Sequence, residues 1–456
     1  MASSRAHENA TQSSVSIRNF GAIGNGVTDD YPAALAAISY LVTLGGGKLI
    51  LPRGRYLFNS SLQINSPSIY LEGEGNTVSY IVNGTTNLPA ISFGDGVTQY
   101  YSGGVSKLGF TGKAGITGVS GQLGLKINKF GQMVLENLRV DSSGSALYKG
   151  VNLVSVSQTF YNKVAVQSCL STGVDLLGVS DLYMESCRSD ANGTVGFLFN
   201  GCQGVYAGGC TAYGNTTQGW YFLSGDPVNA PNKNNFFTSC IGDTSGSYNW
   251  VINDSRDSMF TNCWGCTQLS AVVNTFAAGF ILSGQYCKDL MFTGCIAEYN
   301  NSHGFVIDSS VSAPTKITFN NCTFGATGHG NGRSGAGSGL SISGGANVIT
   351  DVRVNGGSFS DNATSPIVNN STGDVRILGN PIGYNNEQTG VVSVTSGTSI
   401  AITFPQTMIA SPQVIQITPW WNSGTVWASS ITTAGFTINW VNAASPTVFF
   451  SWSAKR

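Results

Sequence analysis

The sequence predicts an all-β chain, in which a long β-solenoid with a short helix near its start is followed by a small antiparallel β-sandwich. Three observations predict this class. A short phrase that ends in cysteine recurs seven times, at intervals of 18 to 32 residues. An aromatic or apolar residue, usually preceded by glycine, recurs in step with it and four times lies ten positions after the cysteine. Finally, the stretch between Glu387 and Lys455 has no charged residue and contains alternating apolar and polar runs, which are typical of antiparallel strands.

The composition excludes several classes of protein. Charged residues make up 10% of the 456-residue chain, against about 25% in a typical globular protein. The net charge is −1 and the basic residues form no runs, which argues against nucleic acid as a partner, because phosphates are neutralised by clustered Lys and Arg. No apolar stretch reaches the roughly 18 residues of a transmembrane helix, so we expect no membrane insertion. We recognise no metal motif, expect no cofactor, and interpret the cysteines as buried free thiols.

The start of the chain predicts a flexible arm over residues 1–15 and then a helix from Pro32 to about Leu44. Asp29 or Asp30 can cap this helix, and proline followed by alanine, leucine and isoleucine suits its first turns. Three glycines end the helix, and residues 48–56 predict a strand with a turn.

This stretch resembles the opening of the pectate-lyase-like right-handed β-helix family found in phage tailspikes. The family pattern is Phe-Gly-Ala-x-Gly-Asp-Gly-x-Thr-Asp-Asp, a short helix, and Gly-Gly-x-(three apolar)-Pro-x-Gly-x-Tyr. Residues 20–30 and 46–56 match its two halves, with Asn25 in place of the usual aspartate. The resemblance implies a right-handed parallel β-helix whose open end is plugged by the helix, so that Asp29 and Asp30 are structural.

The middle of the chain has the constant phrase and variable insertions of a β-solenoid. Each coil is expected to stack on the next at about 4.8 Å. The small cysteine column fits a tight interior bend, and asparagines five residues after it suit a hydrogen-bonded turn. The members of the two columns are Cys169, Cys187, Cys210, Cys240, Cys263, Cys295 and Cys322, and Asn192, Asn215 and Asn300.

The register relative to cysteine also sorts outward from inward positions. Residues five and three before each cysteine and two after it are mostly apolar or small, so we expect them inside. Strand alternation then places the residues one and three after it outside. The outward positions form a stripe of carboxylates with aromatic and basic side chains: Arg188, Asp190, Thr211, Tyr213, Ile241, Asp243, Trp264, Cys266, Ile296, Glu298, Thr323 and Gly325.

A stripe of this kind suits a sugar polymer, because aromatic rings pack on sugars and two carboxyl groups can cleave a glycosidic bond. We expect Asp243, paired with Asp190 or Glu298, to be catalytic. Either pair spans two coils, about 9.6 Å between backbones, which favours the inverting spacing of roughly 6.5–9.5 Å. The remaining expected substrate contacts are Trp264, Tyr213, Tyr299 and Arg188, with Asp254 and Asp308 lining the same or a neighbouring groove.

The C-terminal segment carries five of the eight tryptophans. Its residues 402–405, 430–437 and 449–452 resemble the H-type-lectin-like domains that end many phage tail proteins. A chargeless exposed surface of this size would promote aggregation, so we expect burial between subunits and, as in tailspikes, a homotrimer.

The resemblances imply a phage tailspike in the virion, which acts at the bacterial cell surface. It would bind a capsular or O-antigen polysaccharide, hydrolyse it as a glycoside hydrolase, and dock on another phage tail component through its N-terminus. Two alternatives stay open: a polysaccharide lyase of the same fold and a non-catalytic glycan-binding adhesin. The expected divisions are the arm 1–15, a cap with the first coils 16–75, the β-helix with its glycan groove 76–384, and a sandwich 385–456 for trimerisation or carbohydrate binding.

Overall fold

The computed structural model describes residues 13–455 except 145–146, 225, 227–229, 268–277, 285, 311–313, 326–329, 333–336, 344–346, 364–365, 371–374, 379–386, 405–410, 413, 421–422 and 443–446. The expected flexible arm lies mostly outside the described residues. Strand β1 (Ser14–Ser16) already pairs with the first coil, so the solenoid begins slightly before the boundary expected at residue 16.

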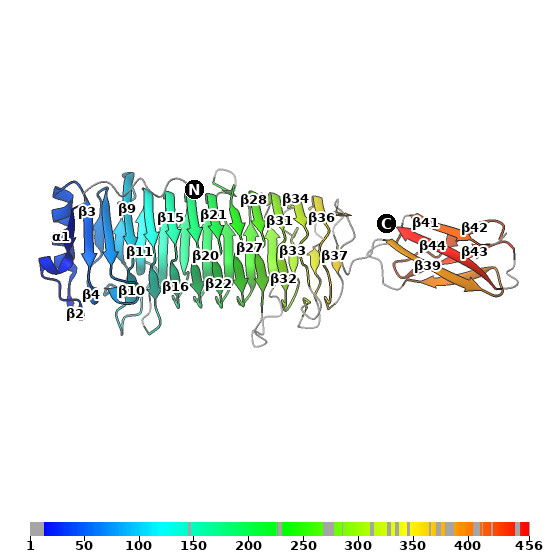
Figure 1. Ribbon diagram of the computed structural model, residues 1–456, viewed down its shortest axis with the longest axis horizontal. Helices are drawn as coiled ribbons and strands as arrows, with labels where there is room; N and C mark the ends of the chain where they lie inside the picture. The colour runs from blue at the N-terminus through cyan, green and yellow to red at the C-terminus, as the bar shows by residue number, and fades with distance from the viewer. Residues whose placement is uncertain are drawn as a thin grey trace.

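Three parallel sheets form an elongated solenoid, and two antiparallel sheets follow it in the chain (Figure 1). Each coil runs through sheet A, then sheet B, then sheet C. In the coil around Cys187, for example, these strands are β18 (Ser180–Glu185), β19 (Arg188–Asp190) and β20 (Val195–Asn200). The predicted fold class, an all-β parallel β-helix with an N-terminal helix and C-terminal antiparallel sheets, is confirmed.

Sheet A is the longest of the three within the described residues. Its strands are β1, β3 (Gly47–Leu51), β6 (Ile69–Gly73), β9 (Tyr100–Ser106), β12 (Phe130–Glu136), β15 (Ser157–Asn162), β18, β21 (Gln203–Gly208), β24 (Asn232–Lys233), β25 (Phe236–Thr238), β28 (Ser255–Thr261), β31 (Lys288–Thr293), β34 (Thr315–Asn320), β36 (Thr350–Asn355) and β38 (Val375–Leu378).

Sheet B has short strands and carries the predicted stripe. Its described strands are β2 (Asn25–Asp29), β4 (Gly54–Phe58), β7 (Ser79–Asn83), β10 (Gly109–Gly112), β13 (Arg139–Asp141), β16 (Ala165–Gln167), β19, β22 (Thr211–Tyr213), β26 (Ile241–Asp243), β29 (Trp264–Cys266) and β32 (Ile296–Glu298).

Sheet C closes each coil. Its described strands are β5 (Leu62–Ile64), β8 (Pro89–Phe93), β11 (Leu123–Asn128), β14 (Lys149–Val154), β17 (Val174–Leu177), β20, β23 (Gln218–Leu223), β27 (Tyr248–Asn253), β30 (Ala278–Ser283), β33 (Phe305–Ile307), β35 (Leu340–Ile342) and β37 (Ile367–Asn369).

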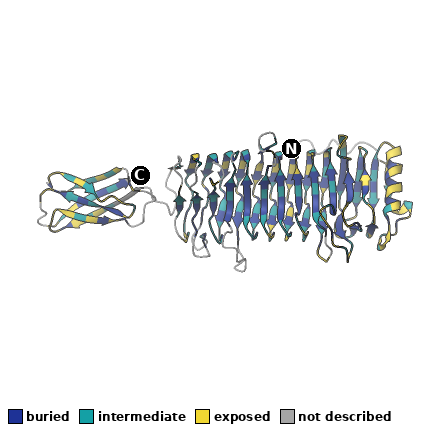
Figure 2. Ribbon diagram, turned by 180° about the vertical axis from the view of Figure 1, so that it is seen from behind, coloured by how far each residue is buried: buried dark blue, intermediate teal, exposed yellow. Residues whose placement is uncertain are grey.

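The N-terminal end is covered by the 3-10 helix η1 (Ile17–Phe20) and by α1 (Tyr31–Thr43). The buried face of α1 packs on the first coil while its other face stays exposed (Figure 2). Asp30 is buried and accepts hydrogen bonds from the backbone N–H groups of Ile23 and Gly24, at 2.7 and 3.1 Å. It therefore fixes the glycine-rich loop before the helix, which agrees with a structural role for this aspartate.

The interior is built from columns that run along the solenoid axis. One stack consists of Phe197, Trp220, Trp250, Phe280 and Phe305, with ring centroids 4.4 to 5.5 Å apart. All ten cysteines are buried free thiols, as predicted. Figure 2 shows that most strand residues along the solenoid are buried or intermediate. Because each coil buries its apolar face against the next, the stack stabilises itself along its length.

Polar ladders hold the corners of the coils. The Asn192 side-chain amide donates to the Oδ1 atom of Asn215 at 2.9 Å, and this column sits at the turn between sheets B and C. At the start of the sheet A strands, Asp181, Asp257 and Asp289 have φ of 50°, 52° and 52°. These left-handed values suit aspartate and explain an acidic column without a catalytic role.

The C-terminal segment forms two three-stranded antiparallel sheets in its described part. A separate core between them includes Trp440, Trp452, Phe436 and Phe450. The strands are β39 (Glu387–Val394), β44 (Val448–Lys455) and β41 (Val414–Pro419) in one sheet, and β40 (Ser399–Thr403), β43 (Gly435–Trp440) and β42 (Val426–Ser429) in the other.

Candidate functional site

The predicted carboxylates lie in one column on the outer face of sheet B. Asp190 pairs with Tyr213, which pairs with Asp243, and two further coils lead through Cys266 to Glu298. The carboxylates therefore stand on alternate coils, about 9.6 Å apart at the backbone for a spacing of about 4.8 Å per coil.

Strand alternation sets the faces of this sheet. Ser189, Ala212 and Ala297, two residues after their cysteines, are fully buried. Their neighbours Asp190 and Tyr213 reach the surface, Tyr213 with 39% of its area exposed. Cys266 lies in the outward column but is buried, so its coil adds a small apolar position between Asp243 and Glu298.

Asp190 has an unusual electrostatic environment. Burial raises the pKa of Asp190, and the Arg188 guanidinium, whose Nη2 atom lies 2.8 Å from Oδ2, offsets this only in part. Its Oδ1 atom is buried and has no hydrogen-bond partner among the described residues. A raised pKa keeps this carboxyl group protonated to a higher pH than an ordinary aspartate, which suits a proton donor.

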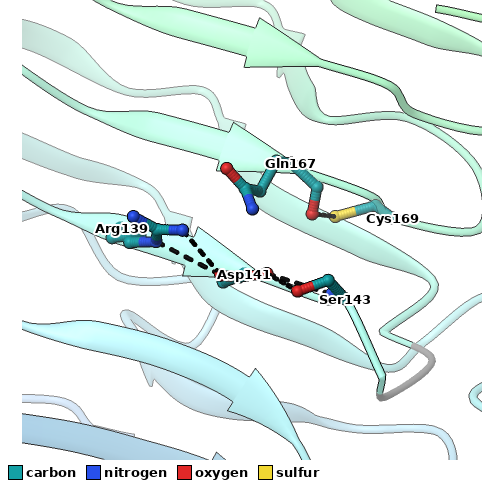
Figure 3. Close-up of polar contacts among 5 residues, drawn as sticks. All are labelled: Arg139, Asp141, Ser143, Gln167 and Cys169. Carbon is teal, nitrogen blue, oxygen red and sulfur yellow. Dashed lines mark hydrogen bonds and ion pairs between the residues drawn. The ribbon is translucent and has the colours of Figure 1, made fainter. Parts of the chain in front are cut away.

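The structure adds Asp141 to the same column, two coils before Asp190 (Figure 3). Asp141 accepts hydrogen bonds from the hydroxyl and N–H of Ser143, at 2.6 and 3.0 Å, and from Nη2 of Arg139 at 2.8 Å. Burial alone would raise the pKa of Asp141, but these bonds and one from Gln167 lower it below its usual value. Two carboxyl groups in one column thus have pKa values displaced in opposite directions.

Reasoning from the cysteine register missed Asp141 because its coil has Leu138 where later coils have cysteine. A signal was nevertheless present. Leu138 and Cys187 are each followed by an arginine one position later and an aspartate three positions later. These residues form the same ion pair in the two coils, Arg139 with Asp141 and Arg188 with Asp190, each with a 2.8 Å contact.

The other stripe residues follow on the next coils. The Oδ1 atom of Asp243 accepts the Thr244 hydroxyl at 2.6 Å. Trp264 is half-buried, and its indole Nε1 is a buried atom without a hydrogen-bond partner among the described residues. Glu298 ends β32, and Tyr299 follows it at a left-handed φ of 58°.

Asp254 and Asp308 are not brought to this column. Both follow strands of sheet C, at the corner that leads into sheet A, so the width of sheet C separates them from the stripe. Asp254 accepts from the Tyr286 N–H at 3.1 Å, and Asp308 accepts from the Ser310 N–H at 2.9 Å. These bonds support the local turns, and a substrate contact by either residue stays a prediction.

Two hollows in the described surface lie on sheet A. One, of about 590 Å³, includes Lys48, Tyr70 and Glu72 near the N-terminal end. The other, of about 660 Å³, runs over β12 to β25. It is lined by Glu136, Phe160, Asn162, Tyr183, Glu185, Tyr206 and Phe236, among others. The sequence signal for this second hollow is the column four residues before each cysteine, where aromatic residues recur.

No group of three or more His, Cys, Asp or Glu side chains within the described ranges is placed to hold a metal ion. The described helices are also all too short or too polar to cross a membrane.

Comparison with solved structures shows which known folds this chain resembles. No family model and no curated protein matches the sequence. The tailspike gp61 of Pseudomonas phage phi297 is similar in structure, with a TM-score of 0.60 at 10% identity over 98% of this chain and 99% of that one. The tailspike gp49 of Pseudomonas phage LKA1 has a TM-score of 0.55 at 14% identity, over 96% and 99%.

An enzyme module shares the architecture as well. The A-module of the mannuronan C-5 epimerase AlgE6 of Azotobacter vinelandii has a TM-score of 0.52 at 14% identity, over 80% of this chain and 94% of that one. At these identities the likeness establishes the fold, and any chemistry has to be argued from the residues of this chain.

Proposed function

We propose that this protein is a phage tail protein that binds a bacterial surface polysaccharide and hydrolyses its glycosidic bonds on the outer face of sheet B. The fold it shares with two phage tailspikes and with an epimerase named for the polysaccharide mannuronan supports the substrate class and a place in the virion. Assembly as a homotrimer and attachment to another tail component through the N-terminus belong to the same proposal.

The observation that carries the proposal is the raised pKa of Asp190 beside carboxylates on alternate coils. Glycoside hydrolysis requires one protonated and one ionised carboxyl group. Asp190 supplies the proton. Asp243 supplies the base, because both oxygens of Asp141 already accept hydrogen bonds from the protein.

The backbone spacing of about 9.6 Å over two coils favours an inverting course. Carboxyl groups roughly 6.5–9.5 Å apart leave room for a water molecule and invert the anomeric centre. Asp243 takes a proton from that water as its oxygen attacks the anomeric carbon. Asp190 protonates the glycosidic oxygen as the carbon–oxygen bond breaks, so each cleavage consumes one water.

Neighbouring side chains provide the binding surface. Tyr213 stands on the coil between the two carboxylates and offers an apolar ring to a sugar. Arg188 adds a donor on the same sheet, and the half-buried ring of Trp264 adds apolar surface. Tyr299 and Glu298 extend the surface toward the C-terminal end.

The test compares reducing-end release by three variants on a polysaccharide that the protein binds. We expect Asp190→Asn and Asp243→Asn each to lower kcat by about 100-fold or more, because general acid or base catalysis contributes about 10²–10⁴-fold. Asp257→Asn is the matched control, since Asp257 lies at a sheet A turn whose left-handed φ asparagine tolerates, and it should keep full activity.

Full activity in both column variants would overturn the assignment of the site. Loss of activity in Asp141→Asn but not in Asp243→Asn would transfer the base role to Asp141. Binding without cleavage by the unaltered protein would support the adhesin, and unsaturated products would support the lyase.

A further inference from the structure

The outer face of sheet A carries a row of aromatic rings that is interrupted near its N-terminal end. Four rings share one register position on consecutive coils and are exposed: Phe160, Tyr183, Tyr206 and Phe236. On the two coils before Phe160 this position holds Val134 and then Gly104. The coil before those returns to a ring, Tyr70. The row therefore has a gap two coils wide, the notch, which is bounded by Tyr70 and Phe160.

The notch exposes a ring face of a kind that the row otherwise covers. Tyr183 stacks on Phe160 and on Tyr206, with centroids 5.3 and 5.1 Å apart and interplanar angles of 19° and 8°, so both of its faces are covered. The second face of Phe160 looks toward the coil of Val134, whose side chain is smaller than a ring. Phe160 is also the most exposed of the four rings, at 49%. A sugar can stack there, because its C–H groups are attracted to the negative face of an aromatic ring.

The space over the notch has the size of a ligand site. The two hollows on sheet A, of about 590 and 660 Å³, both include Val134 and Glu136, so they meet at the notch. Ligand sites commonly enclose about 300–1,000 Å³. Tyr70 and Phe160 are three coil steps apart, about 14 Å between backbones at about 4.8 Å per coil. A Cβ atom at Gly104 would lie 2.8 Å from the Val134 carbonyl oxygen and 3.1 Å from the Tyr70 ring, so glycine keeps the floor of the notch low.

One side of the notch is lined by carboxylates. Glu72 and Glu136 stand on alternate coils, two residues after the row position. Lys48 and Lys107 contact Glu72 at 2.5 and 2.7 Å, so this carboxylate is already paired. Glu136 is exposed, and the bond from the Asn162 amide to its Oε1 atom is long, at 3.4 Å. A carboxylate has about four acceptor sites, so Glu136 can accept hydrogen bonds from sugar hydroxyls.

We propose that the notch is an accessory glycan site, in which a neutral sugar unit stacks on Phe160 and donates hydroxyl hydrogen bonds to Glu136. The negative charge of Glu136 repels an anionic sugar, while Glu72 engages both nearby lysines. The choice of a glycan as ligand rests on the polysaccharide binding proposed above, but the site lies on sheet A, apart from the carboxylate column of sheet B. A second contact would hold the polymer near that column between cleavages, because linked contacts raise the effective concentration.

The test titrates the full-length protein with glucose, galactose, mannose, rhamnose and N-acetylglucosamine, and with glucuronate as the anionic comparison, by saturation-transfer NMR. We expect at least one neutral sugar to bind and glucuronate to bind more weakly. Val134→Tyr should abolish binding, because the new ring continues the stack and covers the open face of Phe160. Phe160→Val should abolish it by removing that face. Glu136→Gln should weaken it by roughly tenfold or more, since hydrogen bonds to a charged acceptor are the stronger ones.

Met291→Val is the matched control for these substitutions. Met291 occupies the same register position outside the notch, with 38% of its area exposed. This variant should bind like the unaltered protein, and circular dichroism should show native β-structure in every variant. Failure of all the neutral sugars to bind, or binding that survives in folded Val134→Tyr, would overturn the proposal.

The notch and the hydrolase are tested separately. Asp190→Asn should bind the sugar as the unaltered protein does, because Asp190 lies on sheet B. A protein that cleaves a polysaccharide but binds no sugar in the notch contradicts the accessory site alone. One that binds in the notch but cleaves nothing contradicts the proposed hydrolysis alone.

Discussion

Arg188 tunes the pKa of Asp190, and this gives the proposed acid a pH signature. Burial raises the pKa of Asp190, and Arg188 acts in the opposite direction. The acid role needs the protonated carboxyl, so activity is expected below the folded-state pKa and lost as pH rises through it.

Arg188→Gln removes the opposing charge, and we therefore expect the alkaline limb of kcat/KM against pH to move to higher pH. Arg139→Gln is the control, because Arg139 contacts Asp141 instead. A limb that stays in place or moves to lower pH in Arg188→Gln would contradict the role of Asp190.

The buried thiols should be inert in the folded protein. Burial raises the pKa of both Cys169 and Cys202 to about 12, and all ten cysteines are buried. Because burial keeps a reagent away from all ten thiols, we expect a thiol reagent at pH 8 to label none of the ten in the native state and all ten in guanidinium. Rapid labelling of several thiols without denaturant would show that the coils open.

At the scale of the element, the turn between sheets B and C depends on its asparagine ladder. Asn215 is buried, and its side chain accepts from the N–H and amide of Asn192 and donates to the Ser189 carbonyl at 2.9 Å. Asn215→Ala leaves the Asn192 donors and the Ser189 carbonyl without this partner. Each buried group left unsatisfied lowers the free energy of unfolding by about 1–3 kcal/mol.

Asn215→Ala should therefore unfold at a clearly lower temperature than the unaltered protein. The control is Asn152→Ala on sheet C, where a half-buried side chain makes one longer bond, of 3.2 Å, to the Asp175 carbonyl. Equal melting temperatures for the two variants would show that the ladder does not stabilise the turn.

The same scale shows which parts of the fold were predictable. Cysteine directly precedes the sheet B strands β19, β22, β26, β29 and β32, so counting from it identified the outward column and its alternate-coil carboxylates. Cys169, which was predicted in the same column, instead follows β16, beside the turn of Asn192. The aspartates at the start of the sheet A strands adopt left-handed turns, a conformation that aspartate tolerates. Asp141 escaped because Leu138 replaces the cysteine that marks the later coils.

At the scale of the whole molecule, the sequence left open what each face does. The aromatic column of sheet A was visible in the sequence, but whether its rings present faces or edges depends on the stacking of neighbouring coils. Asp254 and Asp308 were predicted within reach of a groove, yet three sheets per coil place them at a different corner. A column on sheet B and a corner at the far side of sheet C look alike until the coil is closed.

The solenoid keeps different kinds of surface on different faces. The carboxylate column faces outward on sheet B, while a row of large apolar side chains is exposed on sheet A. A solenoid can divide its surface in this way because each coil repeats the same three faces.

The most direct test of the central claim is mass spectrometry of the products after incubation with purified bacterial capsular and lipopolysaccharide glycans. Hydrolysis at the sheet B column predicts oligosaccharides whose masses are multiples of a repeat unit plus one water, and none of these with Asp190→Asn. Fragments lacking that water, the same fragments from Asp190→Asn, or binding with no fragments at all would contradict it.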